Sequence, residues 1–496
     1  MWRFKLAIAG ALGLLLASAE EIRITEGASD FQVFQRGPDQ SADFKIGGTV
    51  VIANKKMIGK DIEARITTGS RTLSNFDWVP IAKIQKQPKW SGEIKGVPTG
   101  GPYRLEVRIA GSTATFSVDN LLVGDLWLLA GQSNMEGHGD LVDVQQPAPL
   151  VHSFDMADKW LVAEEPLHTL VSAADRVHWR LNENKEPERW TGERLDKFLT
   201  ERKKGAGLGL SFASEMLQRT GIPIGLIPCA HGGTSMDQWS PALRDNGGDS
   251  LYGSMYRRFR AAGGNIKGML WYQGESDTYA KAAPEFLHKF EDFVKAVRTD
   301  FKQPDLPIYY VQIGRHIDNK NIGEWNAVQS AQLAAESQLP HVAMVASIDC
   351  TLDDGIHIST GDLKRIAHRL ADEASHDLFP RVKNYGDLKR GPRPLAAKFE
   401  NGVVTVSFAS VNGKLESDGR ISGFTIHDEK GEPVPLIYKS TIDPAAASTV
   451  LLYVGDKLPA HATLRYGFGK DPYCNLHDVT DQAVPEFGPL LIQSAP

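Results

Sequence analysis

Between about residues 124 and 378, short continuous apolar runs alternate with amphipathic helical patterns, and this alternation restricts the fold more than any other feature. Parallel strands are joined by crossover helices and buried on both faces, so they appear as unbroken apolar runs. We therefore predict an α/β domain of three layers, in which helices cover both faces of a five-stranded parallel sheet. The five expected strands are 126–130, 224–227, 269–272, 308–313 and 342–348.

The sequence on either side of this region has a β pattern. Residues 20–122 and 386–496 alternate apolar with polar side chains, with Gly, Asn and Pro between the runs. A chain of 496 residues is also too long for one ordinary domain. We predict a β-sandwich-like domain at 20–122, the α/β domain at 123–385 and a further β domain, also sandwich-like, at 386–496.

Residues 159–204 are unusually rich in charge and interrupt the α/β pattern between its first two expected strands. We interpret them as an insertion, which forms either a rim over the functional site or a solvated helical hairpin. Trp160, Trp179 and Trp190 lie in this segment. They would either stack on sugar rings or pack the insertion's own small core.

The first nineteen residues have the features of a signal peptide. Arg3 and Lys5 form a basic head, residues 6–16 are apolar, and 17–19 are small. The apolar run is shorter than the roughly 20 residues that span a bilayer, which argues against an anchor. We expect cleavage near residue 19 and export to the periplasm or the extracellular space, with no membrane span in the mature chain.

Charge and cysteine content exclude several classes of protein. Without Arg3 and Lys5, the formal net charge changes from -6 to about -8, with no basic block, so we expect no nucleic acid partner. Three cysteines without CxxC spacing do not form a disulfide framework. Buried thiols are the preferred interpretation for Cys229, Cys350 and Cys474, and a Cys229–Cys350 bridge stays open. No metal-ligand spacing is present, and no cofactor is expected.

Polar or glycine-rich segments follow four of the five expected strands. Loops at the carboxyl ends of an open parallel sheet form its ligand crevice, so these segments should converge at one edge. They are 131–134 (GQSN), 229–234 (CAHGGT), 273–277 (QGESD) and 349–357 (DCTLDDGIH).

Together these segments contain what acyl transfer requires. A serine becomes nucleophilic when a base accepts its proton, and the base needs a carboxylate that holds its tautomer. Ser133 is the candidate nucleophile, His357 the base and Asp354 its orienting carboxylate. Donors for the oxyanion are the Ser133 N–H, the N–H of Gly232 or Gly233, and the Gln273 side chain. Supporting roles fall to Gln132, Asn134 and Glu275.

Other interpretations of the same residues are possible. His138, His231 and His316 compete for the role of base, but His138 and His231 have no acidic residue three positions before them and are better candidates for lining the pocket. Glu275 and Asp277 could form the carboxylate pair of a glycosidase. A non-catalytic carbohydrate-binding protein is the alternative from another class.

Four motifs in order, GQSNM, GGTSMDQW, WYQGESD and DDGIH, resemble the blocks of SGNH-type hydrolases. They are most similar to the sialate O-acetylesterase group, which is related to carbohydrate esterases acting on acetylated xylan. GLGLSFASEML, EWNAVQSAQ and LRYGFGKDPYCNLHD extend the resemblance, whereas Ile358 stands where many relatives have proline.

The resemblance implies an SGNH-like fold and a serine esterase that removes O-acetyl groups from carbohydrates through an acetyl-serine intermediate, without a cofactor. It implies Ser133, Asp354 and His357 as the catalytic set and Trp239 as structural. Gln273 stands where the wider superfamily has an asparagine.

Overall fold

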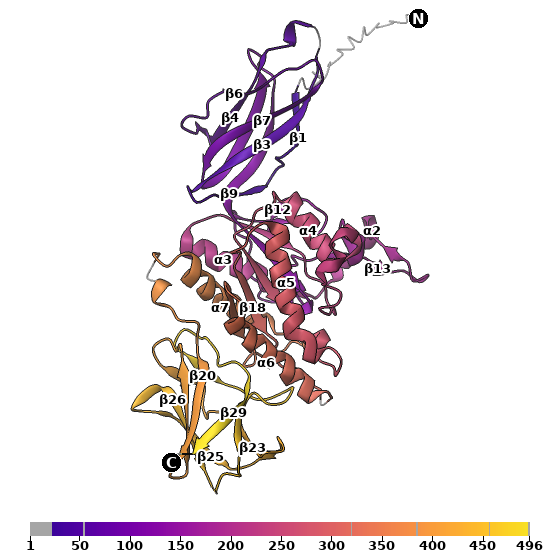
Figure 1. The fold of residues 1–496 in the computed structure, drawn as a ribbon. Helices are drawn as coiled ribbons and strands as arrows, with labels where there is room; N and C mark the ends of the chain where they lie inside the picture. Colours follow the sequence, from indigo (N-terminus) through magenta and orange to yellow (C-terminus); the bar gives the residue numbers. More distant parts are fainter. Residues whose placement is uncertain (1–21, 53–54, 319, 383–384, 456, 495–496) are drawn as a thin grey trace, which may run out of the picture. The chain divides into compact units, whose positions relative to one another are not determined.

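The computed structural model describes residues 22–52, 55–318, 320–382, 385–455 and 457–494 (Figure 1). The predicted signal peptide lies outside these residues. The described chain forms two compact units, an N-terminal unit of 22–29, 43–97 and 102–120 and a second unit that holds the remainder. Within the described ranges, no helix is long and apolar enough to cross a membrane.

The N-terminal unit is built from β-strands, as its alternating sequence predicts. In β4, buried Ile62, Ala64 and Ile66 alternate with more exposed neighbours, so one face of the strand is covered. The sandwich arrangement itself stays a prediction. One sheet holds β1 (Ile22–Glu26), β3 (Ser41–Val50) and β7 (Lys89–Pro98). A second set of paired strands holds β4 (Asp61–Thr68), β5 (Arg71–Thr72), β6 (Val79–Lys83) and β8 (Gly100–Ile109), and β8 also pairs with β9 (Thr115–Gly131).

The central sheet of the second unit contains all five expected strands, but the prediction of a five-stranded sheet is wrong. A sixth parallel strand, β11 (Val151–Phe154), and an antiparallel edge strand, β12 (Trp160–Val162), extend it. Polar His152 and Ser153 interrupt the apolar run of β11 and hid it from the sequence pattern. The sheet order is β12, β11, β16 (Ile224–Pro228), β9 (Thr115–Gly131), β17 (Gly268–Tyr272), β18 (Ile308–Gln312) and β19 (Val342–Ala346).

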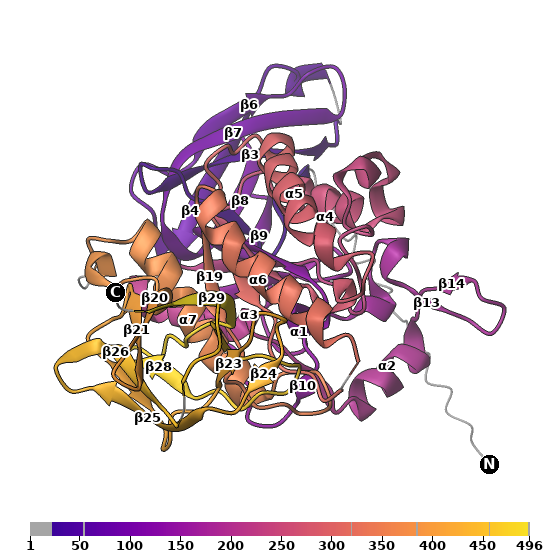
Figure 2. The ribbon, with the colours of Figure 1, turned by 60° about the horizontal axis from the view of Figure 1, so that its bottom comes forward.

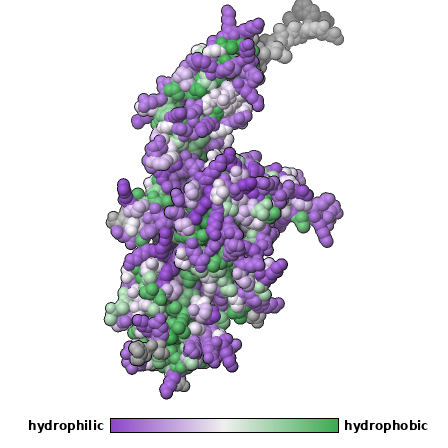
Figure 3. Space-filling model, in the orientation of Figure 1, coloured by the Kyte–Doolittle hydropathy of each residue, from purple (hydrophilic) through white to green (hydrophobic). Residues whose placement is uncertain are grey.

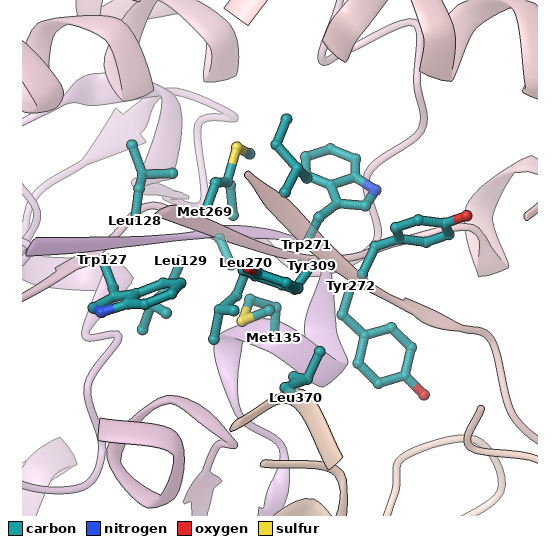
Figure 4. Close-up of a cluster of buried hydrophobic side chains, with 14 of the residues drawn as sticks. Trp127, Leu128, Leu129, Met135, Met269, Leu270, Trp271, Tyr272, Tyr309 and Leu370 are labelled. Atoms are coloured by element: carbon teal, nitrogen blue, oxygen red, sulfur yellow. The ribbon is translucent and has the colours of Figure 1, made fainter. Parts of the chain in front are cut away.

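Helices cover both faces of this sheet, which gives the predicted three layers. Trp127 points to one face, where it meets Phe212 of α3, and Trp271 points to the other, where it meets Phe293 of α5 (Figure 4). Alternation along the buried strands thus supplies apolar side chains to both helix layers. One layer holds α3 (Gly209–Thr220) and α7 (Thr360–Leu378), and the other holds α4 (Leu251–Ala261), α5 (Phe286–Phe301) and α6 (Ile322–Gln338).

The C-terminal part of this unit is also β, as predicted, and has its own apolar core. It forms one eight-stranded sheet and a two-stranded ribbon of β22 (Leu415–Ser417) and β28 (Leu476–Asp478). A sandwich arrangement here stays a prediction. The sheet order is β24 (Pro433–Val434), β23 (Phe424–His427), β27 (Thr463–Tyr466), β29 (Phe487–Ser494), β20 (Arg393–Glu400), β21 (Val403–Ala409), β26 (Ala446–Val454) and β25 (Ile437–Asp443).

All three cysteines are buried free thiols. Burial raises the pKa of the Cys229 thiol to about 11, so it stays protonated at neutral pH. This agrees with the preferred interpretation of Cys229, Cys350 and Cys474 as packed thiols.

Candidate active site

Ser133 stands where the central strand β9 ends. The strand stops at Gly131, whose φ of +134° and close approach to the Tyr272 carbonyl leave no room for a side chain. The chain then turns at once into the short helix α1 (Ser133–Glu136). Ser133 thereby lines a cavity of about 900 Å³. Its hydroxyl has no hydrogen-bond partner in the described chain, so no structural contact occupies it.

His357 and Asp354 lie together in the loop between β19 and α7. The Nδ1 of His357 is 2.9 Å from Oδ2 of Asp354, and Oδ1 of Asp354 accepts the backbone N–H of His357 at 2.9 Å. Lys204 approaches the same carboxylate at 2.9 Å. Although partial burial would raise the pKa of Asp354, hydrogen bonds from His357 hold it well below its ordinary value. Asp354 is therefore a carboxylate that fixes the imidazole.

His357 lines the same cavity as Ser133, and its Nε2 has no hydrogen-bond partner among the described residues. Burial lowers the pKa of His357, and the Asp354 carboxylate only partly offsets this effect. The ring is consequently neutral near pH 7 and can accept a proton. No Ser133–His357 hydrogen bond is formed within the described chain, but such bonds are often long in free enzymes and tighten around substrate.

The amides on either side of Ser133 brace the surrounding loops. Gln132 Oε1 accepts the backbone N–H of Ser276 at 3.3 Å. Asn134 donates to Glu275 at 2.8 Å and accepts the N–H of Ile358 at 3.0 Å, so one side chain joins the third loop to the histidine loop. Glu275 also lines the cavity, and burial raises its pKa to about 7.

The expected oxyanion donors do not all face the cavity. Gln273 is fully buried and does not line it, and its amide donates to the Thr234 carbonyl and the Asp277 carboxylate. Because both of its hydrogens are engaged, Gln273 has none free for an oxyanion in this geometry, and its predicted donor role stays a prediction. Gly232 donates its N–H to Glu136 Oε2 at 2.7 Å. The N–H of Gly233 has no acceptor in the part of the chain that the structure describes.

The remaining candidates have different environments. Asp277 is buried, accepts the N–H of Met236 and does not line the cavity, so a glycosidase pair with Glu275 gains no support. His138 does line it, with its ring stacked on that of His357 at 4.4 Å between centroids. His316 lies outside the cavity, beside Trp325.

The charged insertion forms part of the cavity wall. Its first residues belong to β12, and α2 (Gly192–Glu201) is its one helix longer than a turn, so the predicted helical hairpin is wrong. Figure 2 shows α2 and the β13–β14 ribbon (Arg180–Leu181, Pro187–Glu188) as separate projections, which are largely hydrophilic (Figure 3). Wall residues from the insertion are His168, Leu170, Val171, His178, Trp179, Arg180, Phe198, Glu201, Arg202, Lys203 and Lys204.

Of the three tryptophans considered for sugar stacking, Trp179 lines the cavity. Trp160 is buried against Phe154 in the sheet, and Trp190 packs on Phe198. Trp239 is fully buried, as expected for a structural residue.

Sequence reasoning missed several buried polar residues in the cavity wall. Glu136 lies one helical turn after Ser133, and this spacing could have identified it. His168 and His178 come from the insertion, and nothing in their sequence context signals the site. Burial lowers the pKa of His168 to about 4, so it is neutral. Among the described residues, no cluster of His, Cys, Asp or Glu could hold a metal ion.

Comparisons with known proteins place this site in a family. The family model described as carbohydrate esterase, sialic acid-specific acetylesterase, matches residues 123–376, about half of the chain. A probable carbohydrate esterase of Arabidopsis thaliana is 31% identical over 263 residues, which cover 47% of this chain and 84% of the relative. The sialate O-acetylesterase of Homo sapiens is 21% identical over 341 residues, covering 62% of this chain and 63% of the relative.

Solved structures agree on the fold. The crystal structure of a carbohydrate acetylesterase from Xanthomonas citri aligns with a TM-score of 0.64 and 22% identity, covering 94% of this chain and 99% of that one. This likeness is one of fold, and it extends across the flanking β regions. The chain belongs to the carbohydrate esterase family of sialic acid-specific acetylesterases and is a carboxylic ester hydrolase.

Proposed function

We propose that the protein removes O-acetyl groups from carbohydrates through an acetyl-serine intermediate. The observation that carries the proposal is the convergence of Ser133 and the Asp354-bound His357 on one cavity. Family membership restricts the reaction to ester hydrolysis on a carbohydrate.

Each residue of the set has a defined task in this mechanism. The Ser133 oxygen attacks the acetyl carbonyl while Nε2 of His357 takes its proton, and Asp354 stabilises the imidazolium. The N–H groups of Ser133 and Gly233 are the donors open to the oxyanion. His357 then protonates the sugar oxygen as the C–O bond breaks, and a water activated by His357 releases acetate from Ser133.

Export to the periplasm or the extracellular space is part of the proposal and rests on the leader-like residues 1–19. An O-acetylated polysaccharide or glycoconjugate would be met there. Periplasmic and culture fractions, probed with an antibody against a C-terminal tag, test this directly. Recovery of the uncleaved chain in the cytoplasm would contradict it.

Acetate release tests the activity itself. We expect the wild type to release acetate from p-nitrophenyl acetate and from acetylated xylan or O-acetylated sialic acid. A wild type that is inactive on all three substrates would contradict the proposal, and the preferred sugar ester would identify the substrate class.

A further inference from the structure

A continuous row of polar side chains leads from the cavity wall into the protein. The Nδ1 of His231 is 3.1 Å from Nδ1 of His178, and Nε2 of His178 is 3.2 Å from the Ser254 hydroxyl. Ser254 in turn donates to Asp175 at 2.6 Å. Arg257 binds this carboxylate at 2.8 Å, so the row ends on an ion pair between a buried carboxylate and a half-buried arginine.

Hydrogen-bond accounting fixes where each proton lies. Asp175 is a carboxylate paired with Arg257, so the Ser254 proton points to it, and the Ser254 oxygen must accept from Nε2–H of His178. Burial lowers the pKa of His178 far below its ordinary value, so the ring is neutral and its Nδ1 carries no proton. The bond between the two histidines therefore requires Nδ1–H on His231.

This tautomer leaves Nε2 of His231 as an acceptor when the ring is neutral. Burial lowers the pKa of His231, with a smaller opposing effect from Glu136, which favours the neutral ring. Within the described chain Nε2 has no partner, and it is not among the polar atoms sealed from solvent. Since His231 lines the cavity, a fixed acceptor is available to substrate there.

The backbone that carries this acceptor lies next to the reacting centre. His231 precedes Gly232, and a Cβ on Gly232 would be 3.3 Å from Cβ of Ser133 and 3.5 Å from Nε2 of His138. The backbone N–H of His231 is also bound to the Gly131 carbonyl at 3.0 Å, which ties it to the strand that presents Ser133. Because His231 and Ser133 line the same cavity, we infer that the group that reaches this histidine belongs to the part of the substrate near the ester.

We propose that His231 is a specificity-determining residue whose Nε2 accepts a hydrogen bond from a free hydroxyl on the sugar carbon beside the acetylated one. The inference rests on the proposed function and adds a substrate class to it, namely sugars that are not acetylated at this neighbouring position. A bound substrate without this hydroxyl would shield Nε2 of His231 from water and leave it without a hydrogen bond. Sites of this kind discriminate strongly between substrates with and without the hydroxyl.

The test compares three substrates on the full-length protein. They are p-nitrophenyl acetate, an O-acetylated methyl glycoside with a free neighbouring hydroxyl, and the same glycoside with that hydroxyl methylated. In the wild type we expect kcat/KM to favour the free hydroxyl by about 10- to 100-fold. Activity on p-nitrophenyl acetate without this preference overturns the inference alone, whereas inactivity on all three also overturns the proposed function.

Two variants separate recognition from structure. His231→Phe should reduce the preference to about 1, and an equal loss on both glycosides would assign His231 a structural role instead. Ser254→Ala removes the acceptor that fixes His178, so the tautomers can exchange and the preference should fall. A preference unchanged in Ser254→Ala would contradict the relay.

A measurement on the wild type does not depend on either variant folding. In protein labelled with 15N-histidine, the NMR signals of His231 should show a protonated Nδ1 and an unprotonated Nε2 at neutral pH. The reverse tautomer would overturn the inference.

Discussion

Replacement of Glu275 by glutamine should remove a pH dependence from the stability of the fold. Burial raises the pKa of this carboxyl from 4.5 to about 7, so the native protein keeps a proton that the unfolded chain releases. The stabilising contribution is complete below about pH 4.5 and is lost as the pH rises through about 7. Glutamine keeps an oxygen for the 2.8 Å bond from Asn134 but does not ionise.

The size of the effect follows from the shift. Between pH 5 and pH 8 the free energy of unfolding of the wild type should fall by about 2 to 3 kcal/mol, because one pKa unit corresponds to about 1.4 kcal/mol. The Glu275→Gln variant should not show this decrease. For a unit of roughly 390 residues, the melting temperature of the variant relative to wild type should then rise by roughly 2 to 4 °C. Calorimetry at both pH values measures this shift.

Glu183→Gln is the matched control, because Glu183 is exposed and belongs to the same compact unit. Its melting temperature relative to wild type should be the same at pH 5 and pH 8. If Glu275→Gln behaves in the same way as this control, the native protein holds no proton on Glu275, and the argument from burial is refuted.

Three further predictions follow from the site. Asp354→Asn should lower kcat by about 10³- to 10⁴-fold, measured by steady-state kinetics, because an amide cannot hold the imidazole tautomer or stabilise the imidazolium. Burial chiefly lowers the pKa of His357, and the charge of Lys204 lowers it further. Lys204→Met should therefore raise this pKa and move the acidic limb of the pH–rate profile to higher pH. An unchanged acidic limb would contradict this prediction. Gly131→Ala should prevent folding, because its Cβ would lie 2.1 Å from a backbone oxygen. Gly221→Ala is the control, since Gly221 has a φ of +69° but open space around it, and thermal melting should show a loss of only about 1 kcal/mol in the free energy of unfolding.

The central sheet could be predicted from sequence where the strands are apolar. β17 and β19 contain no charged residue and are buried throughout, so sequence pattern and structure agree. β11 was missed because His152 occupies a buried position by donating its Nδ1–H to the Phe31 carbonyl, 2.7 Å away. A short strand with buried polar side chains has no continuous apolar signature.

The candidate site was predictable where function depends on local sequence. Asp354 and His357 are three residues apart in one loop, so their contact follows from the sequence itself. The orientation of the Gln273 side chain was not predictable, because its amide is held by hydrogen bonds to Thr234 and Asp277 in the core. Long-range packing decides such directions.

The contribution of the insertion was even less accessible to sequence reasoning. His178 is 53 positions from His231 in the sequence and 76 positions from Ser254. Such a row of hydrogen bonds exists only after the insertion has packed against α4. Composition identified the segment as charged but not as part of the cavity wall.

Rapid-quench mass spectrometry of the enzyme during turnover tests the central claim most directly. With saturating acetylated substrate at neutral pH and a quench into acid, which protonates His357 and stops deacetylation, the wild type should carry one acetyl group on the peptide containing Ser133. Ser133→Ala should carry none and lose at least about 1,000-fold in acetate release. Acetate release by Ser133→Ala at the wild-type rate, or an acetyl group on another residue, would contradict the account.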